Sequence, residues 1–110
     1  MGIGQYDEVE VGDNAKELVV LYRHMIEAYR KCADLKAGGK DYANEKMRMQ
    51  KIEIKVNALW PQLSNNEQKG CCSQLIISGY MDCRIGELMI MFGSTVSVNE
   101  PEEPCLRLKL

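Results

Sequence analysis

The first long hydrophobic pattern in the chain lies between residues 14 and 37, where apolar side chains recur at steps of three and four. Because an α-helix has 3.6 residues per turn, this spacing predicts an amphipathic helix of about six turns. Asp13 or Asn14 can cap its start, and Gly38-Gly39 predicts its end. The members of the stripe are Leu18, Leu21, Tyr22, Met25, Ala28, Tyr29, Cys32 and Leu35.

A second helical pattern begins near Asp41 and is the most regular in the chain. Its stripe consists of Tyr42, Glu45, Met49, Ile52, Val56, Leu59 and Leu63. Only Glu45 is charged, and it lies near the helix end, where a long side chain can reach solvent or cap the backbone. Pro61 is expected to bend or end the helix. Two such helices joined by a short glycine-containing loop are expected to pack antiparallel, because only then are both stripes buried.

A third helix is expected from Ser64 to about Phe92. Ser64 and Glu67 have the spacing of a capping box, in which side chain and backbone pair reciprocally. Two apolar stripes follow, one of Ile77, Met81, Leu88 and Met91, and the other of Cys72, Ile76, Gly79, Cys83, Gly86, Ile90 and Gly93. The heptad spacing of the glycines predicts close backbone approach along one continuous helix. A break near Gly79, which divides residues 67–93 into two helices, is the alternative.

These patterns predict an all-α protein, an antiparallel up-down helical bundle of three to four long helices. Residues 1–13 are expected to form an extended lead, in which a short strand is one option, and residues 14–93 the bundle. Residues 94–110 form a tail that Pro101 and Pro104 keep from being helical. Its end alternates Leu106, Leu108 and Leu110 with basic residues, a strand period. The alternatives for this tail are that it forms a short strand, packs on the bundle, adds to another chain or has no fixed structure. The whole is expected to be one domain.

Composition narrows the compartment and the partners. The net charge is −2 and the pI about 5.4, without the basic surface that nucleic-acid binding usually needs. Five cysteines form no CxxC pair, and the N-terminal residues have no signal-peptide pattern, so a cytoplasmic protein with reduced cysteines is expected. Asp82, Arg84 and Glu87 interrupt the most apolar segment, which argues against membrane insertion.

No residue pattern predicts catalysis, a metal or a cofactor. His24 is the only histidine, and no second histidine or cysteine follows it at helical ligand spacing. Cys71 and Cys72 are adjacent and would face different ways on a helix. Nucleotide-binding, serine-hydrolase and zinc-protease motifs are absent, and acidic residues such as Glu53 are interpreted as solvent-exposed. The chain is therefore expected not to be an enzyme, and protein binding is favoured.

Three segments in order resemble a known family. Tyr6 precedes a helix that contains Glu17-Leu18 and, three residues later, Leu21-Tyr22. Residues 51–63 follow as a second helical motif, and residues 79–85 match half of a third. The order and spacing are similar to those of the FliS-type flagellar secretion chaperones, over roughly residues 6 to 92. The first arginine of the third motif is Cys83 here, Pro61 falls inside the second motif, and the closing helix is replaced by the tail.

The resemblance implies a cytoplasmic export chaperone or adaptor that holds the helix-prone C-terminal segment of flagellin in apolar surface grooves, with the export apparatus as a further partner. The abundance of apolar helical surface near the end of the third helix is consistent with such a groove. Partner-binding residues would be Tyr6, Leu21, Tyr22, Met25, Tyr80, Met81, Arg84 and Leu88. The alternative is a structural or regulatory bundle that forms a homodimer through its third helix and tail.

Overall fold

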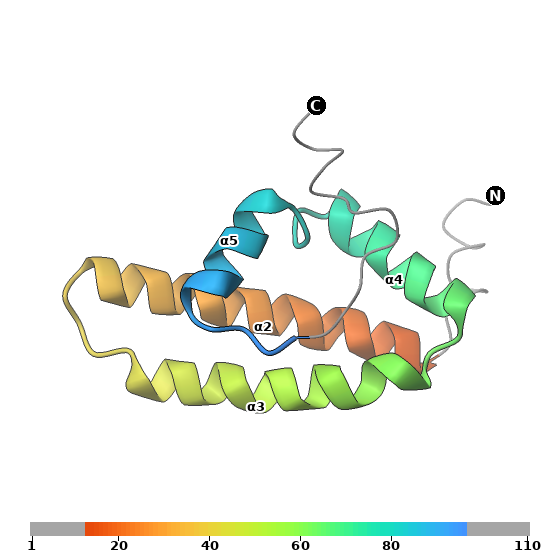
Figure 1. Ribbon diagram of the computed structural model, residues 1–110, viewed down its shortest axis with the longest axis horizontal. Helices are drawn as coiled ribbons and strands as arrows, with labels where there is room; N and C mark the ends of the chain where they lie inside the picture. The colour runs from red at the N-terminus through yellow and green to blue at the C-terminus, as the bar shows by residue number, and fades with distance from the viewer. Residues whose placement is uncertain (1–12, 97–110) are drawn as a thin grey trace.

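The computed structural model describes residues 13–96, which form an all-α arrangement (Figure 1). The elements are α2 (Asp13–Ala37), α3 (Ala43–Leu59), the 3-10 turn η1 (Trp60–Gln62), α4 (Asn65–Ile77) and α5 (Cys83–Met91). Within residues 13–96 no β-strand is present, so the predicted fold class is confirmed. Predictions for the lead, with Tyr6, and for the tail beyond Val96 lie outside the described residues.

Helix α2 is the common partner of the other helices. It packs against α3, α4 and α5, and its interface with α3 is the most extensive. Figure 1 shows α2 and α3 as two long helices side by side, with the shorter α4 and α5 on the opposite side of α2 from α3. The expected bundle of three to four long helices is therefore a long antiparallel hairpin with two short helices on one flank.

The predicted stripes of the hairpin form its core. Every member of the α2 stripe is buried or half-buried, and so is every member of the stripe that runs from Tyr42 to Leu63. Met25 and Tyr29 on α2 and Val56 on α3 are fully enclosed. Burying one such side chain contributes roughly 1.5–3 kcal/mol, so the periodicity of the two helices accounts for their pairing.

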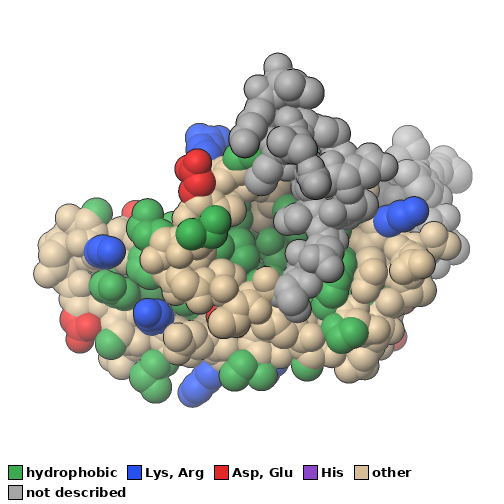
Figure 2. Space-filling view, viewed as in Figure 1, with side chains coloured by type: hydrophobic (Ala, Val, Ile, Leu, Met, Phe, Trp, Pro, Cys, Tyr) green, Lys and Arg blue, Asp and Glu red, His purple; other side chains and the backbone are tan. Residues whose placement is uncertain are grey.

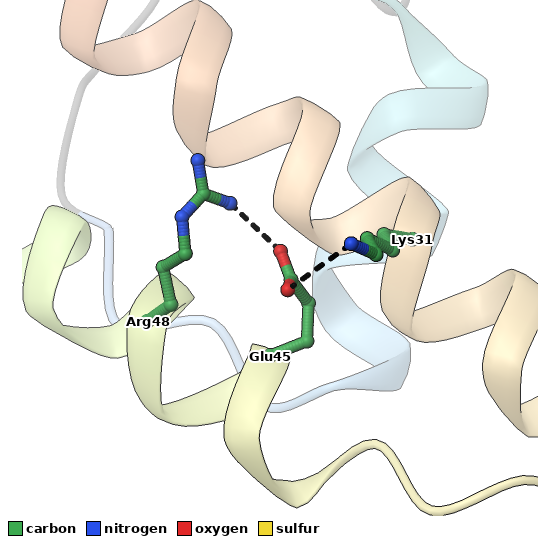
Figure 3. A network of polar contacts seen from close by, with 3 residues as sticks. All are labelled: Lys31, Glu45 and Arg48. Atoms are coloured by element: carbon green, nitrogen blue, oxygen red, sulfur yellow. Dashed lines mark hydrogen bonds and ion pairs between the residues drawn. The ribbon is translucent and has the colours of Figure 1, made fainter.

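Glu45, the charged member of the α3 stripe, is held between two cations (Figure 3). Its Oε2 lies 2.7 Å from Arg48 Nη1, one helical turn along α3, and its Oε1 lies 3.8 Å from Lys31 Nζ on α2. The Glu45 side chain is only 12% exposed, whereas both cations remain more than half exposed. The negative charge of Glu45 therefore lies at the interface between α2 and α3, where it is paired with one cation from each helix.

The helix boundaries follow the local signals. Helix α2 ends at Ala37, and Gly39 adopts a φ of 70°, which costs least for a residue without Cβ. The Lys40 amide then donates to the Leu35 carbonyl at 2.8 Å, which closes the last turn. Helix α3 ends directly before the turn that contains Pro61. The predicted ends of both long helices are confirmed.

The prediction of one continuous third helix is wrong. The capping box at Ser64 is present, but α4 ends at Ile77 and α5 begins only at Cys83. Gly79 has a φ of 82° and terminates α4, and Asp82 starts α5 because its carboxylate accepts from the Ile85 amide at 2.8 Å. The break near Gly79, the alternative interpretation, is the observed structure.

Two of the three glycines of the heptad do not mark close backbone packing. Gly79 and Gly93 both have positive φ angles and follow the ends of helices. A Cβ added at either position would meet no atom within 4 Å. These two glycines are therefore selected by backbone conformation at helix ends, and their spacing reflects the lengths of α5 and its turns.

Candidate partner-binding groove

An open pocket of about 570 Å³ lies where α5 and the turn before it meet α2. Its lining consists of Arg30, Gly79, Asp82, Arg84, Ile85, Glu87, Leu88 and Met91. We call this pocket the α5 groove. On the face drawn in Figure 2, apolar side chains gather over α5.

Apolar side chains form the wall of the α5 groove. Ile85 is buried, Leu88 is half-buried and Met91 is 59% exposed, so the wall grades from the core out to solvent. On the neighbouring face of the same helix, Ile90 is 77% exposed. A helix with apolar side chains on most of its faces is typical of one that is covered on more than one side. Helix α5 is covered by α2 on one side.

Four charged residues line the α5 groove, two basic and two acidic. Asp82 caps α5, and Arg84 and Glu87 lie exposed on the same helix. Arg30 of α2 donates from Nη2 to the Gly79 carbonyl at 3.4 Å. The groove therefore offers both signs of charge beside its apolar wall, as an amphipathic segment with mixed charges would require.

The turn between α4 and α5 is fixed on α2 by Tyr80. The guanidinium carbons of Arg23 and Arg30 lie 5.6 Å and 5.3 Å from the centroid of its ring, within cation–π distance. The Tyr80 hydroxyl donates to Glu27 Oε2 at 3.2 Å. All three partners are on α2 at helical spacing, so one aromatic side chain positions the N-terminal end of α5.

The C-terminal side of α5 is tied to a buried carboxylate that the sequence pattern misassigned. Glu53 was expected to be exposed, but it is only 4% exposed. The Tyr29 hydroxyl donates to its Oε2, and the Thr95 hydroxyl donates to its Oε1 at 3.2 Å. Burial and the hydrogen bond to Glu53 raise the pKa of Tyr29, so this tyrosine remains a neutral donor. The sequence contained one signal that Glu53 is buried: it lies four residues after Met49 and three before Val56, on the buried face of α3.

Of the predicted partner-binding residues, three lie at or beside the α5 groove. Arg84 and Leu88 line it, and Tyr80 adjoins its wall in the turn before α5. Leu21 is half-buried on α2. Tyr6 lies outside the described residues. The structure adds Met91, Ile85 and Arg30 to the groove, and none of the three was among the predicted partner-binding residues.

The other three predicted partner-binding residues are part of the core. Tyr22 and Met81 are 3% exposed, and Met25 is fully buried. None of the three offers a surface to a partner in this structure, which corrects the expectation that they line an open groove. The reason is that helical periodicity shows which face of a helix is covered. It does not show whether a partner or another part of the same chain covers that face. Here Tyr22 donates its hydroxyl to Met89 Sδ of α5 at 3.9 Å.

The described residues contain no group of three or more His, Cys, Asp or Glu side chains arranged to hold a metal ion. Burial raises the pKa of the Cys71 thiol to about 12, and its Sγ donates to the Ala15 carbonyl at 3.4 Å. Such a thiol is a packing group, because the thiolate is the reactive form.

The described helices also include none with both the length and the apolarity needed to cross a membrane. The candidate site consists of the α5 groove and the two attachments that hold α5, through Tyr80 and through Thr95. The groove combines an apolar wall with charged groups at a helix surface, a combination suited to binding a peptide segment. In comparisons with protein-family models, curated proteins and solved structures, no match to this chain is found.

Proposed function

We propose that the protein is a cytoplasmic export chaperone or adaptor that holds a helix-prone segment of a secreted client, such as the C-terminal segment of flagellin, at the α5 groove. The observation that supports this proposal is the apolar surface of α5 that the described chain leaves uncovered. Met91 and Ile90 are both more than half exposed beside the half-buried Leu88. Neighbouring exposed apolar side chains of this kind often mark a protein-binding surface.

The physical basis is the match between a groove beside a helix and an amphipathic client. A client helix can place apolar residues at steps of three and four against Leu88 and Met91. Its charged residues can pair with Arg84 and Glu87 at the margin, where such pairs contribute more to specificity and association rate than to affinity. A disordered client loses entropy on binding, so the apolar contact must supply most of the affinity.

Binding of a fluorescent peptide from the flagellin C-terminus, measured by anisotropy, tests the proposal. Met91→Asp should weaken binding by about tenfold or more, because the charge replaces an apolar contact. Met47→Asp is the matched control, since Met47 is 56% exposed on α3, away from the groove. Equal affinities for the two variants would exclude the α5 groove as the binding site. Failure of the unaltered protein to bind the peptide would exclude this client.

Self-association is the second candidate function, and the exposure of two isoleucines favours it. Ile77 is 85% exposed at the end of α4, and Ile90 is 77% exposed on α5. A homodimer that covers these side chains would have a concentration-dependent mass in light scattering. Ile90→Asp should dissociate it, whereas Ile54→Asp, at a 68% exposed position of α3, should not. A monomer at all concentrations would rule out the homodimer.

A further inference from the structure

Helix α5 and the residues that follow it, 83–96, are here called the α5 arm. The arm packs on the hairpin through Ile85, Met89 and Phe92, which are spaced by four and then three residues. Met89 Sδ accepts from the Tyr22 hydroxyl, and the ring centroid of Phe92 lies 6.2 Å from that of Tyr29. This i, i+4, i+7 pattern is the same one by which amphipathic helices dock in grooves of other proteins.

The α5 arm is a short element with little stability of its own. Its helix has nine residues, fewer than an isolated helix needs to be stable in water. Beyond Phe92 the backbone is held by Asn57, whose Nδ2 donates to the Thr95 carbonyl at 2.9 Å. The Thr95 hydroxyl bonds Glu53, yet Thr95 itself is exposed. Ile85 and Phe92 are buried, but short elements at the surface open more often than the long packed helices of a fold.

Opening of the α5 arm would uncover a second apolar surface on the hairpin. That surface contains Tyr22 and Tyr29 of α2, which the arm contacts through Met89 and Phe92. At its end lies the Glu53 carboxylate, which would lose the Thr95 hydroxyl. A buried carboxylate that loses a donor is costly, so a replacement occupant should bring one.

We infer that the client binds the hairpin surface that the α5 arm covers, here called the seat. A client helix displaces the α5 arm from this surface. This inference depends on the proposed client-holding function. The arm defines the client's chemistry: an amphipathic helix with large apolar residues at i, i+4 and i+7, followed three residues later by Ser or Thr. In the arm these positions are Ile85, Met89, Phe92 and Thr95. The α5 groove, beside the seat, is where such a helix first makes contact.

Hydrogen exchange of the full chain, with and without the flagellin C-terminal peptide, distinguishes displacement from simple docking. Displacement should make the amides of α5 exchange about tenfold faster or more in the complex, while those of α3 are unchanged or slower. A client that only lies in the α5 groove beside the arm would instead slow exchange in α5. Slower or unchanged exchange in α5 on saturation would overturn the inference.

A peptide with the sequence of residues 83–96 provides a second probe. It should compete with the resident arm for the seat and speed exchange in α5 of the full chain. The control peptide carries Ser in place of Ile85, Met89 and Phe92 and should not bind. If the two peptides behave alike, the seat does not recognise the arm's apolar pattern and the inference fails.

Variants at Thr95 test the attachment of the α5 arm. Thr95→Val keeps the shape and removes the hydroxyl, so α5 should open more often. The hairpin should then bind the arm peptide about fivefold more tightly, the factor of one ordinary hydrogen bond. Thr95→Ser retains a hydroxyl and should restore the original behaviour. Faster exchange by the same factor in α2, α3 and α5 would show that the arm is not a separate unit, which overturns the inference.

The inference and the proposed function fail separately. If the arm peptide binds and speeds exchange in α5 but the flagellin peptide does not bind, the client is wrong and the displaceable arm stands. If the flagellin peptide binds and slows exchange in α5, the function stands and displacement is refuted. A stable dimer in which α5 of each copy occupies the seat of the other would also refute client displacement.

Discussion

Replacing Tyr29 by Phe removes one oxygen atom from a buried polar contact of the core. The hydroxyl of Tyr29 donates to Glu53 Oε2, and both residues are nearly inaccessible to solvent. The ring would remain against Phe92, 6.2 Å away between centroids. Glu53 would keep the Thr95 hydroxyl on its other oxygen. The substitution therefore removes the donor to Glu53, together with the hydrogen bond between Ser94 and the same hydroxyl, with little change in packing.

The expected loss of unfolding free energy follows from the charge on the acceptor. Hydrogen bonds to charged groups contribute about 1.5–3 kcal/mol net, more than those between neutral groups, because an ionised oxygen loses more when it is left unpaired. We expect Tyr29→Phe to cost about 2 kcal/mol. Small domains are stable by only about 5–15 kcal/mol, so this loss is a substantial fraction.

Urea unfolding followed by circular dichroism at pH 7 measures the effect. The midpoint should fall by about 1 M for a denaturant slope of roughly 2 kcal/mol per M. Tyr42→Phe is the matched control, because Tyr42 is half-buried and contacts the same Phe92 through its ring, with centroids 5.6 Å apart. The control should change the unfolding free energy by less than about 0.5 kcal/mol.

A double substitution separates loss of the hydrogen bond from damage to packing. Glu53→Leu in the Tyr29→Phe background also removes the carboxylate that has lost the Tyr29 donor, so much of the lost stability should return. The coupling energy between the two sites should be about 1–3 kcal/mol. A Tyr29→Phe variant as stable as the unaltered protein, or effects that simply add, would refute the assignment of Glu53 as a buried, paired carboxylate.

Three further outcomes are expected. Ser64→Ala, which removes the capping box of α4, should cost about 1 kcal/mol in urea unfolding, whereas Ser73→Ala on the exposed face of the same helix should be neutral or slightly stabilising. Gly39→Ala should cost about 1 kcal/mol because of its φ of 70°, and the neighbouring Gly38→Ala, which meets only ordinary contacts from 3.6 Å, should cost nothing measurable in thermal unfolding. Because burial raises the pKa of Tyr29 above its ordinary value near 10, the unfolded chain loses this proton first, so stability should fall as the pH rises above about 10. Urea titrations between pH 8 and 11 should show this decline, and a Tyr29→Phe variant with an equally steep decline would show that Tyr29 is not its cause.

The hairpin could be predicted from sequence because the apolar spacing and the helix-end signals agreed with its tertiary role. The stripe of α3 runs from Tyr42 to Leu63 without a slip, and Pro61 marks the end of the helix. The second half of the chain was less predictable. Gly79 fits a heptad pattern in a continuous helix and also fits a helix terminus, and only the positive φ distinguishes the two. Asp82, in position to cap α5, was the local signal for the second interpretation.

The groove was only partly predictable, because periodicity does not identify what covers a helix face. Leu88 and Arg84 were assigned to it, and they line it. Tyr22 and Met25 carry the same pattern but lie under elements of the chain itself. Glu53 was missed because a carboxylate on a helix is usually exposed, and its donors come from residues 24 and 42 positions away.

Because α2 lies at the centre of the fold, the helices should differ in how well they tolerate substitutions. A substitution on the buried faces of α2 disturbs contacts with several helices at once, whereas one in α4 or α5 disturbs mainly its contact with α2. Changes in α4 and α5 should therefore combine additively, since the two helices share few contacts. Natural variation would accumulate first in the two short helices, where surface chemistry can diverge while the long pair preserves the architecture.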